Sequence, residues 1–457
     1  MQEFVLQERV EDSIRAFGKF ISSPHVVNDI NLLRKGIVVM SSLDKSQVRG
    51  IWKPAYYMAM AEVYRNCVRL SSKGFINYDN NDIILHIQYL RKALFHCQEY
   101  PDLKNILLIN LGHAFSDIKR FSEAIKCWEQ VLLNRQHSSE AIIATVLCNI
   151  GSCVSDMTPL LPNKFLIARF VSIGKKCLED ALTCKSINKS LEQTLRTALS
   201  RLVDRERFLL KDNNISISAI NYGEMKSDFA FWSRDNVLFL NPLSDISVEP
   251  ESFADIIDLS FLKEDKYKFL ISGYDELKQQ YVFSRKMLHE SVNENNDMKS
   301  KASFRLAYSV LDKLAGLINH YFGLGYNNEV LSYNKIWFTK KSNKKQVAEK
   351  LSKTDNPYMI ALYWISRDVF LEGEESSDPE AADIAKCRNY IEHRFVEVVK
   401  ENVFEENYSN SQLLIGQGTL YEKCLKLHCI IRNAMLYFYM AVKWQSLKED
   451  TNMHRTA

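Results

Sequence analysis

Several features that would mark particular classes of protein are scarce or missing in this chain. Its 457 residues include only 15 glycines and 9 prolines, while hydrophobic residues make up 46%. A disordered or low-complexity protein would be richer in glycine and proline and poorer in apolar side chains. We therefore expect a well-packed chain that is too long for one hydrophobic core and forms two or three domains.

Metal-ligand spacings and membrane-length apolar runs are also missing. The ten cysteines form no C-x-x-C pair. We interpret them as small buried side chains in a reducing compartment rather than as zinc ligands or disulfides. The longest apolar stretch, 434–442, is far shorter than the ~20 residues of a membrane helix, and the N-terminus has no signal-peptide pattern. The sequence thus predicts a cytoplasmic protein with no membrane partner and no metal or cofactor.

Positive charge is concentrated in one segment rather than spread along the chain. The net charge of +3 neither implies nor excludes nucleic acid as a partner. The densest cluster, which we take as a candidate contact for the RNA backbone, contains Lys340, Lys341, Lys344 and Lys345, with Lys350 and Lys353 beyond. The alternative interpretation is a solvated loop or helix face.

The N-terminal residues 1–205 show the pattern of paired helices. Gly112 and Ala124 are small enough to let two antiparallel helices approach closely, and Trp128 fills the space beside them. The pattern resembles the tetratricopeptide repeat, with looser copies near Pro54 and Ile150 and another helix pair over 5–40. The alternative is an irregular helical array with one chance repeat. Either array would present an extended surface suited to a protein or peptide regulator.

A connector is expected over 206–255 and a second helical region over 256–450. Within the connector, 215–220 alternates with period two and 237–240 is a short apolar run before Asn-Pro, so both are strand candidates. The fold class predicted is therefore all-α with a small extended connector. Helices are expected near 274–292, 301–323, 357–371, 379–402 and 419–447.

The six residues Arg388-Asn389-Tyr390-Ile391-Glu392-His393 carry the candidate chemistry. An imidazole can move a proton at neutral pH, and a guanidinium can hold a phosphate oxyanion. A second match, Arg91 to His96, lies in a repeat-like helix, where we assign it to chance or to a structural role. Residues 379–402 are predicted to form a helix that begins at the cap Asp378 and Pro379, with Ser377 as an alternative cap.

Helical periodicity predicts where the candidate residues point. The apolar stripe predicted for the core contains Ile384, Cys387, Ile391, Phe395 and Val398. Asn389 and His393 lie about 160° from Ile391 around the axis, hence away from the core, while Arg388 lies at the stripe's edge. The alternative is a salt bridge from Arg388 to Glu392 and an ordinary exposed imidazole at His393.

The C-terminal half is similar to the HEPN superfamily of helical-bundle proteins, whose ribonuclease members carry R-x4-6-H. The resemblance covers about 255–447 and includes Tyr281 to Arg285, Phe304 to Tyr308 and Leu311 to Leu314. The segment Leu238 to Leu243, together with the helical repeats before it, resembles the arrangement in a prokaryotic branch of HEPN proteins that fuse tetratricopeptide-like repeats to the nuclease. Such proteins resemble toxins or antiviral defence effectors.

This resemblance implies a metal-independent endoribonuclease that acts as a homodimer on RNA. His393 would move the proton, Arg388 would stabilise the charged phosphorane, and Asn389 would orient His393 or contact the phosphate. The alternative function is a non-catalytic interaction scaffold with a silent bundle. Nucleotide binding is disfavoured, because no glycine-rich phosphate loop is present. His428 and Arg432, four apart on the last helix, are interpreted as core polar groups.

Overall fold

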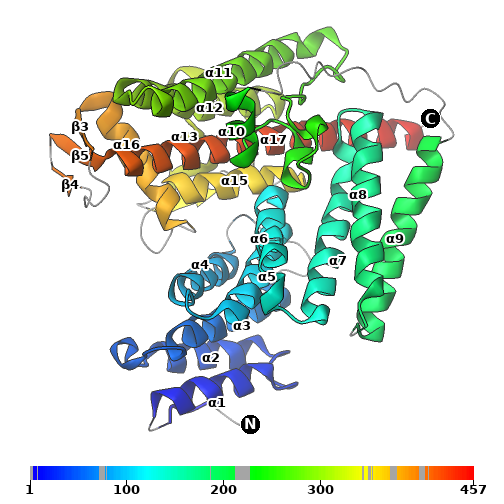
Figure 1. Cartoon of the computed structure of the whole chain (residues 1–457), viewed down its shortest axis with the longest axis vertical. Coiled ribbons are helices and arrows are strands. Elements are labelled where there is room, and N and C mark those ends of the chain that lie inside the picture. Colours follow the sequence, from blue (N-terminus) through cyan, green and yellow to red (C-terminus); the bar gives the residue numbers. More distant parts are fainter. Residues whose placement is uncertain are drawn as a thin grey trace. The chain divides into compact units, whose positions relative to one another are not determined.

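The computed structural model describes the backbone over most of the chain. The described residues are 4–7, 9–71, 78, 80–185, 187–210, 227–341, 344–347, 351, 354–370, 378–400, 407–409 and 411–456. They divide into two compact units, the first containing 1–156 and 171–205 and the second containing 157–170 and 206–457. Helices dominate both units (Figure 1), so the predicted all-α class is confirmed.

The first unit is an array of helices in which sequence neighbours pack as pairs. Its helices are α1 (Val10–Ser22), α2 (Ile30–Ser41), α3 (Trp52–Ser71), α4 (Asn81–His96), α5 (Pro101–Asp117), α6 (Phe121–Leu133), α7 (Glu140–Met157), α8 (Lys164–Thr183) and α9 (Lys189–Leu210), with α8 beginning and α9 ending in the second unit. The pairs α3–α4 and α5–α6 make the most extensive contacts of the array.

Helices α5 and α6 approach each other closely at a glycine, Gly112. A Cβ atom on Gly112 of α5 would lie 2.3 Å from Nε1 of Trp128 on α6. The Trp128 ring is buried, and its Nε1 donates a 3.4 Å hydrogen bond to the carbonyl of Ile109. Gly112 is therefore required because the indole occupies the space that any side chain would need. The predicted packing of this pair is confirmed.

One helical stretch, Glu140–Leu160, is the only one among the described residues that is long and apolar enough to cross a membrane. Half of its apolar window is buried inside the protein. A Cβ atom on Gly151 in this helix would lie 2.6 Å from Leu178 of α8, so the two helices are closely packed. Its apolar residues thus serve a protein core.

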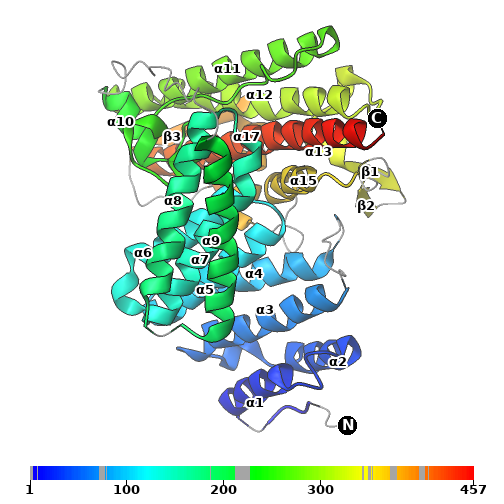
Figure 2. The ribbon, with the colours of Figure 1, turned by 90° about the vertical axis from the view of Figure 1, so that its right-hand side faces the viewer.

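The second unit is a bundle built around one long helix. Its helices are α10 (Asp228–Asp235), α11 (Lys268–Asn293), α12 (Asp297–Tyr321), α13 (Tyr333–Trp337), α15 (Pro357–Phe370), α16 (Pro379–His393) and α17 (Gln417–Thr456). α11 and α12 form a close pair, and α17 lies between this pair and α15 (Figures 1 and 2). The five helices expected in this region are confirmed, although the helix predicted over 379–402 ends at His393.

The bundle also contains two small sheets that the sequence analysis missed. β1 (Phe338–Lys341) and β2 (Lys344–Val347) pair as an antiparallel hairpin. The strands β3 (Phe395–Val399), β4 (Asn407–Tyr408) and β5 (Gln412–Gly416) form a sheet in the order β3–β5–β4. The strand predicted over 237–240 is wrong, because these residues are irregular backbone, and the one predicted over 215–220 lies outside the described residues.

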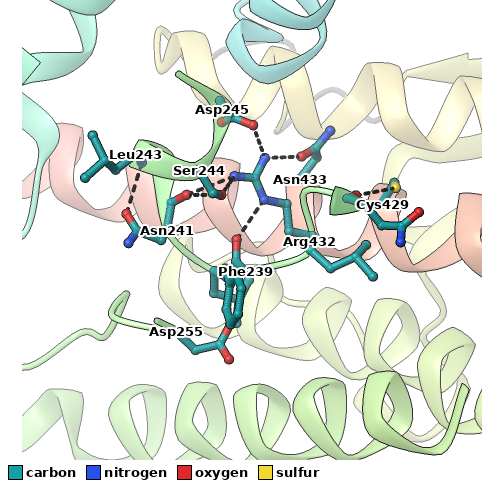
Figure 3. A network of polar contacts seen from close by, with 12 residues as sticks. Phe239, Asn241, Leu243, Ser244, Asp245, Asp255, Cys429, Arg432 and Asn433 are labelled. Atoms are coloured by element: carbon teal, nitrogen blue, oxygen red, sulfur yellow. Dashed lines mark hydrogen bonds and ion pairs between the residues drawn. The ribbon is translucent and has the colours of Figure 1, made fainter. Parts of the chain in front are cut away.

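The apolar run 237–240 is irregular because its backbone binds arginine side chains instead of a neighbouring strand. Arg432 of α17, only 1% exposed, lies at the centre of the network in Figure 3. Its five N–H donors are all satisfied, by the carbonyls of Phe239 (3.0 Å) and Asn241 (3.0 Å) and the side chains of Ser244 (3.0 Å), Asp245 (2.6 Å) and Asn433 (3.0 Å).

A second buried arginine holds the preceding residue of the same segment. Arg285 of α11 donates to the carbonyl of Leu238 at 2.6 Å and forms a two-pronged ion pair with Asp255 at 2.6 and 3.1 Å. Asp255 also accepts the backbone N–H of Leu240 at 2.7 Å. The carbonyls of Leu238 and Phe239, which a strand would have paired, are thus satisfied by guanidinium groups, which fixes the segment to the bundle.

Gly112→Ala should destabilise the first unit by about 1–3 kcal/mol, because the new methyl group must displace a buried indole. Gly18→Ala is the matched control. Gly18 lies inside α1 with nothing within 4 Å of an added Cβ, so the same change there should stabilise by about 0.5–1 kcal/mol. Urea denaturation measures both. Equal effects at the two positions would contradict the close-contact explanation.

Arg432→Met should cost about 3–5 kcal/mol of unfolding free energy, because it leaves Asp245 charged and buried without its partner. Lys313→Met, which removes an exposed pair with Glu276 in the same unit, should cost less than about 1 kcal/mol. Chemical denaturation compares them, and a loss at Arg432 no larger than at Lys313 would show that the network is not essential to the fold.

Candidate active site

The candidate helix α16 begins as predicted and ends nine residues early. The Asp378 side chain accepts the backbone N–H of Ala381, and Pro379 occupies the first turn. Arg394, directly after His393, is fully extended, with φ −141° and ψ −176°. The alternative cap Ser377 lies outside the described residues.

Two members of the predicted apolar stripe are therefore not on the helix. Ile384, Cys387 and Ile391 are buried as expected. Phe395 and Val398 lie on β3, and Phe395 is 78% exposed. The sequence signal that marks the change is the alternating, β-branched run Phe-Val-Glu-Val-Val, which favours a strand over a helix.

The predicted orientation of the candidate residues is confirmed. Asn389 and His393 are exposed, whereas Ile391, between them, is buried. His393 is the last residue of α16, so its imidazole lies where the helix gives way to the sheet. A side chain at this position is accessible to a ligand and contributes little to the packing of its own unit.

Arg388 lies half-buried against α12. Its guanidinium carbon is 5.3 Å from the ring centroid of Tyr308, and Nη1 donates a 3.5 Å hydrogen bond to Oδ1 of Asn389. Its Nε is buried and has no hydrogen-bond partner. The expected alternative, a salt bridge to Glu392, is absent among the described residues, because Glu392 pairs instead with Arg305 of α12 at 3.8 Å. The Arg388 charge is therefore not neutralised by a carboxylate in ion-pair contact.

An acidic group farther along α12 lies within the field of Arg388. Burial raises the pKa of Asp312, and the backbone N–H of Tyr333 together with the positive charge of Arg388 opposes that rise. The backbone N–H of Tyr333 donates to Asp312 at 3.0 Å, so one carboxylate oxygen is already bonded. Arg388 is thus held by an aromatic face and a distant charge, an arrangement that leaves its Nη atoms able to bind an anion.

Two further cations from α12 meet the end of α16, and the sequence analysis did not single them out. Arg305 donates to the carbonyl of Ile391, one of the carbonyls left open at the helix C-terminus. Lys301 donates a 2.7 Å hydrogen bond to the carbonyl of Val396 on β3. Both contacts fix the junction between α16 and β3 and place positive charge around it.

The lysine-rich segment forms the β1–β2 hairpin rather than the loop or helix face of the alternative interpretation. Its register pairs Lys340 with Lys345 and Lys341 with Lys344, so the four candidate RNA-binding residues lie on one hairpin. In Figure 2 this hairpin lies well to the side of β3, away from the end of α16. Lys350 and Lys353 lie outside the described residues.

His428 is buried and bonded, as the core interpretation predicts. Its Nδ1 is 2.7 Å from the carbonyl of Cys424, and its Nε2 is 3.1 Å from the hydroxyl of Ser284. Burial lowers the pKa of His428 to about 4, so the ring is neutral at physiological pH. His428 and the fully bonded Arg432 are therefore structural groups of the bundle, separate from the exposed face of α16.

The rival motif on α4 makes structural contacts. The guanidinium carbon of Arg91 lies 5.6 Å from the ring centroid of Phe115 on α5, and the His96 ring stacks on Tyr57 of α3 at 5.5 Å. Both side chains thus contact neighbouring helices of the array, as their structural interpretation predicts.

The cysteines lie where their interpretation as small buried side chains predicts. All ten cysteines are free and seven are buried, which supports their interpretation as core residues. Within the described residues, no group of three or more histidine, cysteine, aspartate or glutamate side chains could hold a metal ion.

Comparison with known proteins identifies one domain. Residues 296–445 match the family described as LA2681-like HEPN. No curated protein and no solved structure matches the chain. The matched span is narrower than the resemblance predicted over 255–447, and it runs from the start of α12 into α17. It includes α16 with Arg388, Asn389 and His393. Within the C-terminal bundle, residues 296–445 are therefore similar to LA2681-like HEPN domains, and this span includes the candidate site.

Proposed function

We propose that the protein is a metal-independent endoribonuclease whose reaction takes place at Arg388, Asn389 and His393. The observation that carries the proposal is the state of these side chains within a HEPN domain. His393 and Asn389 are exposed, and Arg388 lies beside them with no carboxylate of the described residues in ion-pair contact. An exposed imidazole next to an available guanidinium provides the proton carrier and the anion-binding group that RNA transesterification requires.

The reaction is attack of a ribose 2′-hydroxyl on the adjacent phosphate. His393 accepts the 2′ proton as general base or donates a proton to the leaving 5′ oxygen as general acid. Arg388 binds the phosphate and stabilises the charge that develops on its oxygens. Asn389, one turn before His393, orients the ring or contacts the phosphate. DNA has no 2′-hydroxyl and should not react.

The exposed position of the motif favours a site that is completed by a second copy of the chain. One arginine and one histidine on a single exposed helix face enclose a phosphate poorly. A two-fold dimer through the bundle would bring two copies of the same face together. The lysine-rich β1–β2 hairpin would attract the RNA backbone at longer range.

The helical array of the first unit is proposed to regulate the nuclease. Stacked helix pairs present an extended surface suited to binding a protein or peptide, and none of the candidate catalytic residues lies in the array. A nuclease under such control would suit a toxin or an antiviral defence effector. The competing function is a non-catalytic scaffold with a silent HEPN domain, and an RNA cleavage assay separates the two.

Purified protein should cleave single-stranded RNA in EDTA and leave 2′,3′-cyclic phosphate ends. His393→Ala should slow cleavage by about 10²–10⁴-fold, because it removes the proton carrier. Arg388→Ala should slow it by about 10²–10³-fold, because it removes charge stabilisation of the phosphorane. Cleavage is measured by gel analysis of end-labelled RNA.

Two control variants sharpen this assay. His320→Ala removes another exposed histidine from the same unit, and His96→Ala tests the rival motif on α4. Both should cut RNA at the rate of the unaltered protein. Cleavage that persists in His393→Ala, or that requires magnesium, would overturn the catalytic assignment. Loss of cleavage in a folded His96→Ala protein would move the site to α4.

The active species should be a dimer, as measured by light scattering under cleavage conditions. A mixture of Arg388→Ala and His393→Ala protomers should regain part of the activity that either variant lacks alone. Each mixed dimer retains one arginine and one histidine, which can meet if the motifs face one another. A fully active monomer would contradict this arrangement.

A further inference from the structure

The three-stranded sheet begins where the candidate helix ends. His393 closes α16, Arg394 is extended, and Phe395 is the first residue of β3. Successive side chains of an extended segment alternate between its two sides, so Arg394 and Phe395 point to opposite sides of the chain. β3 thus starts two residues after the proposed catalytic histidine, directly where α16 ends (Figure 1).

The strand register separates the sheet into an inner and an outer face. β3 pairs in parallel with β5, with Val396 opposite Leu413 and Val398 opposite Ile415. Leu413 and Ile415 are fully buried, so these four side chains form the inner face against the bundle. The alternate residues must lie on the outer face.

The outer face presents one large aromatic ring. Phe395 is 78% exposed, opposite Gln412 in the register, although a phenylalanine at a structural position would normally be covered. Beside it, Glu397 accepts a 2.6 Å hydrogen bond from Nε2 of Gln412. This bond holds the carboxylate on the same face while leaving it able to accept from a ligand. An aromatic ring with a fixed hydrogen-bond acceptor is the combination that binds an unpaired nucleotide base.

A lysine lies at the edge of this face. The backbone N–H of Phe395 donates to the carbonyl of Ser411, so the backbone groups of Phe395 point toward β5. Backbone groups of successive strand residues point to opposite edges, so the carbonyl of Val396 points away from β5, where Lys301 binds it. Arg394 is exposed on the other side of the chain from Phe395, with its guanidinium carbon 4.7 Å from the ring centroid of Tyr390. The lysine at the edge of β3 suits the phosphate that joins a stacked base to the next nucleotide.

We propose that the outer face of the β3–β5 sheet is a base-binding platform for single-stranded RNA. Phe395 stacks on the base next to the scissile phosphate, and Glu397 accepts from an exocyclic amino group of that base. The proposal rests on the nuclease function proposed above, because it places the base relative to His393. It adds a substrate class, unpaired RNA, and a preference for bases that carry an amino donor.

The alternative occupant of Phe395 is the second protomer of a dimer. RNA is favoured, because the polar residues beside the ring, Glu397 and Gln412, are charged or amide-bearing. The buried centre of a protein interface is depleted of charged residues.

The test is binding of a short 2′-O-methyl oligoadenylate to the full-length protein, followed by fluorescence anisotropy. The blocked 2′ oxygen prevents cleavage, so binding is measured separately from the reaction. Phe395→Ala should weaken binding by about 5- to 150-fold, the range for loss of one stacked base. Phe395→Trp should retain binding, since an aromatic face remains.

Phe269→Ala is the matched control. Phe269 is a 56% exposed phenylalanine at the start of α11, and its ring contacts His320 at the far end of α12. The Phe269→Ala protein should bind RNA as tightly as the unaltered protein. The platform is overturned if the Phe395→Ala protein binds the oligonucleotide as tightly as the Phe269→Ala protein. It is also overturned if the unaltered protein does not bind the oligonucleotide. Phe395→Ala that becomes monomeric in light scattering assigns the ring to the dimer and also overturns it.

Base preference provides a second test. The unaltered protein should bind 2′-O-methyl oligocytidylate more tightly than oligouridylate, because only cytosine offers an amino donor to Glu397. The preference should be about 5-fold or more and should disappear in Glu397→Ala. Equal affinities in the unaltered protein overturn the role of Glu397.

The two proposals fail in different ways. If the unaltered protein cleaves RNA through His393 but Phe395→Ala binds normally, the platform is wrong and the nuclease stands. If Phe395→Ala selectively loses binding but no RNA is cleaved, the sheet binds RNA and the nuclease is wrong.

Discussion

Two buried guanidinium groups hold the C-terminal bundle together at its most irregular segment. Arg285 and Arg432 come from different helices, yet both bind backbone carbonyls of the same segment. Arg285 binds the carbonyl of Leu238, and Arg432 binds those of Phe239 and Asn241. Their charges are matched by Asp245 and Asp255 from the same segment. Because an unpaired buried charge is costly, neither partner can be removed without destabilising the other. The segment and the helices α11 and α17 therefore depend on one another.

The proposed active site follows the opposite principle, because its side chains are left incompletely satisfied. Arg432 uses all five of its donors within the protein, whereas Nε of Arg388 has no hydrogen-bond partner among the described residues and its guanidinium contacts an aromatic ring and an amide. Because Nε is buried, the Nη atoms of Arg388 are the donors that the proposed phosphate would meet.

The position at which α16 ends places the proposed catalytic residues and the proposed base-binding residues on one short segment, α16 and β3. A helix that continued to 402, as periodicity predicted, would have buried Phe395 in the core stripe. Ending at His393 instead turns the chain into a strand, which places Phe395 on an exposed sheet face and lets Arg305 and Lys301 cover the junction. The stop reflects the β-branched run after Arg394 and the pairing partner supplied by β5, which is distant in sequence.

Local pattern alone determined the helical class, the pairing of Gly112 with a large neighbour, the cap of α16 and the outward direction of Asn389 and His393. Each depends on spacing within one or two turns, or on the size of adjacent side chains. Tertiary structure alone decided that Glu392 pairs with Arg305 rather than Arg388 and that the run 237–240 binds arginines instead of a strand. It also decided, together with the β-branched run after Arg394, that Phe395 lies on a sheet. These outcomes depend on hydrogen bonds and ion pairs with partners 15 to 193 residues away in the chain, which local sequence patterns do not reveal.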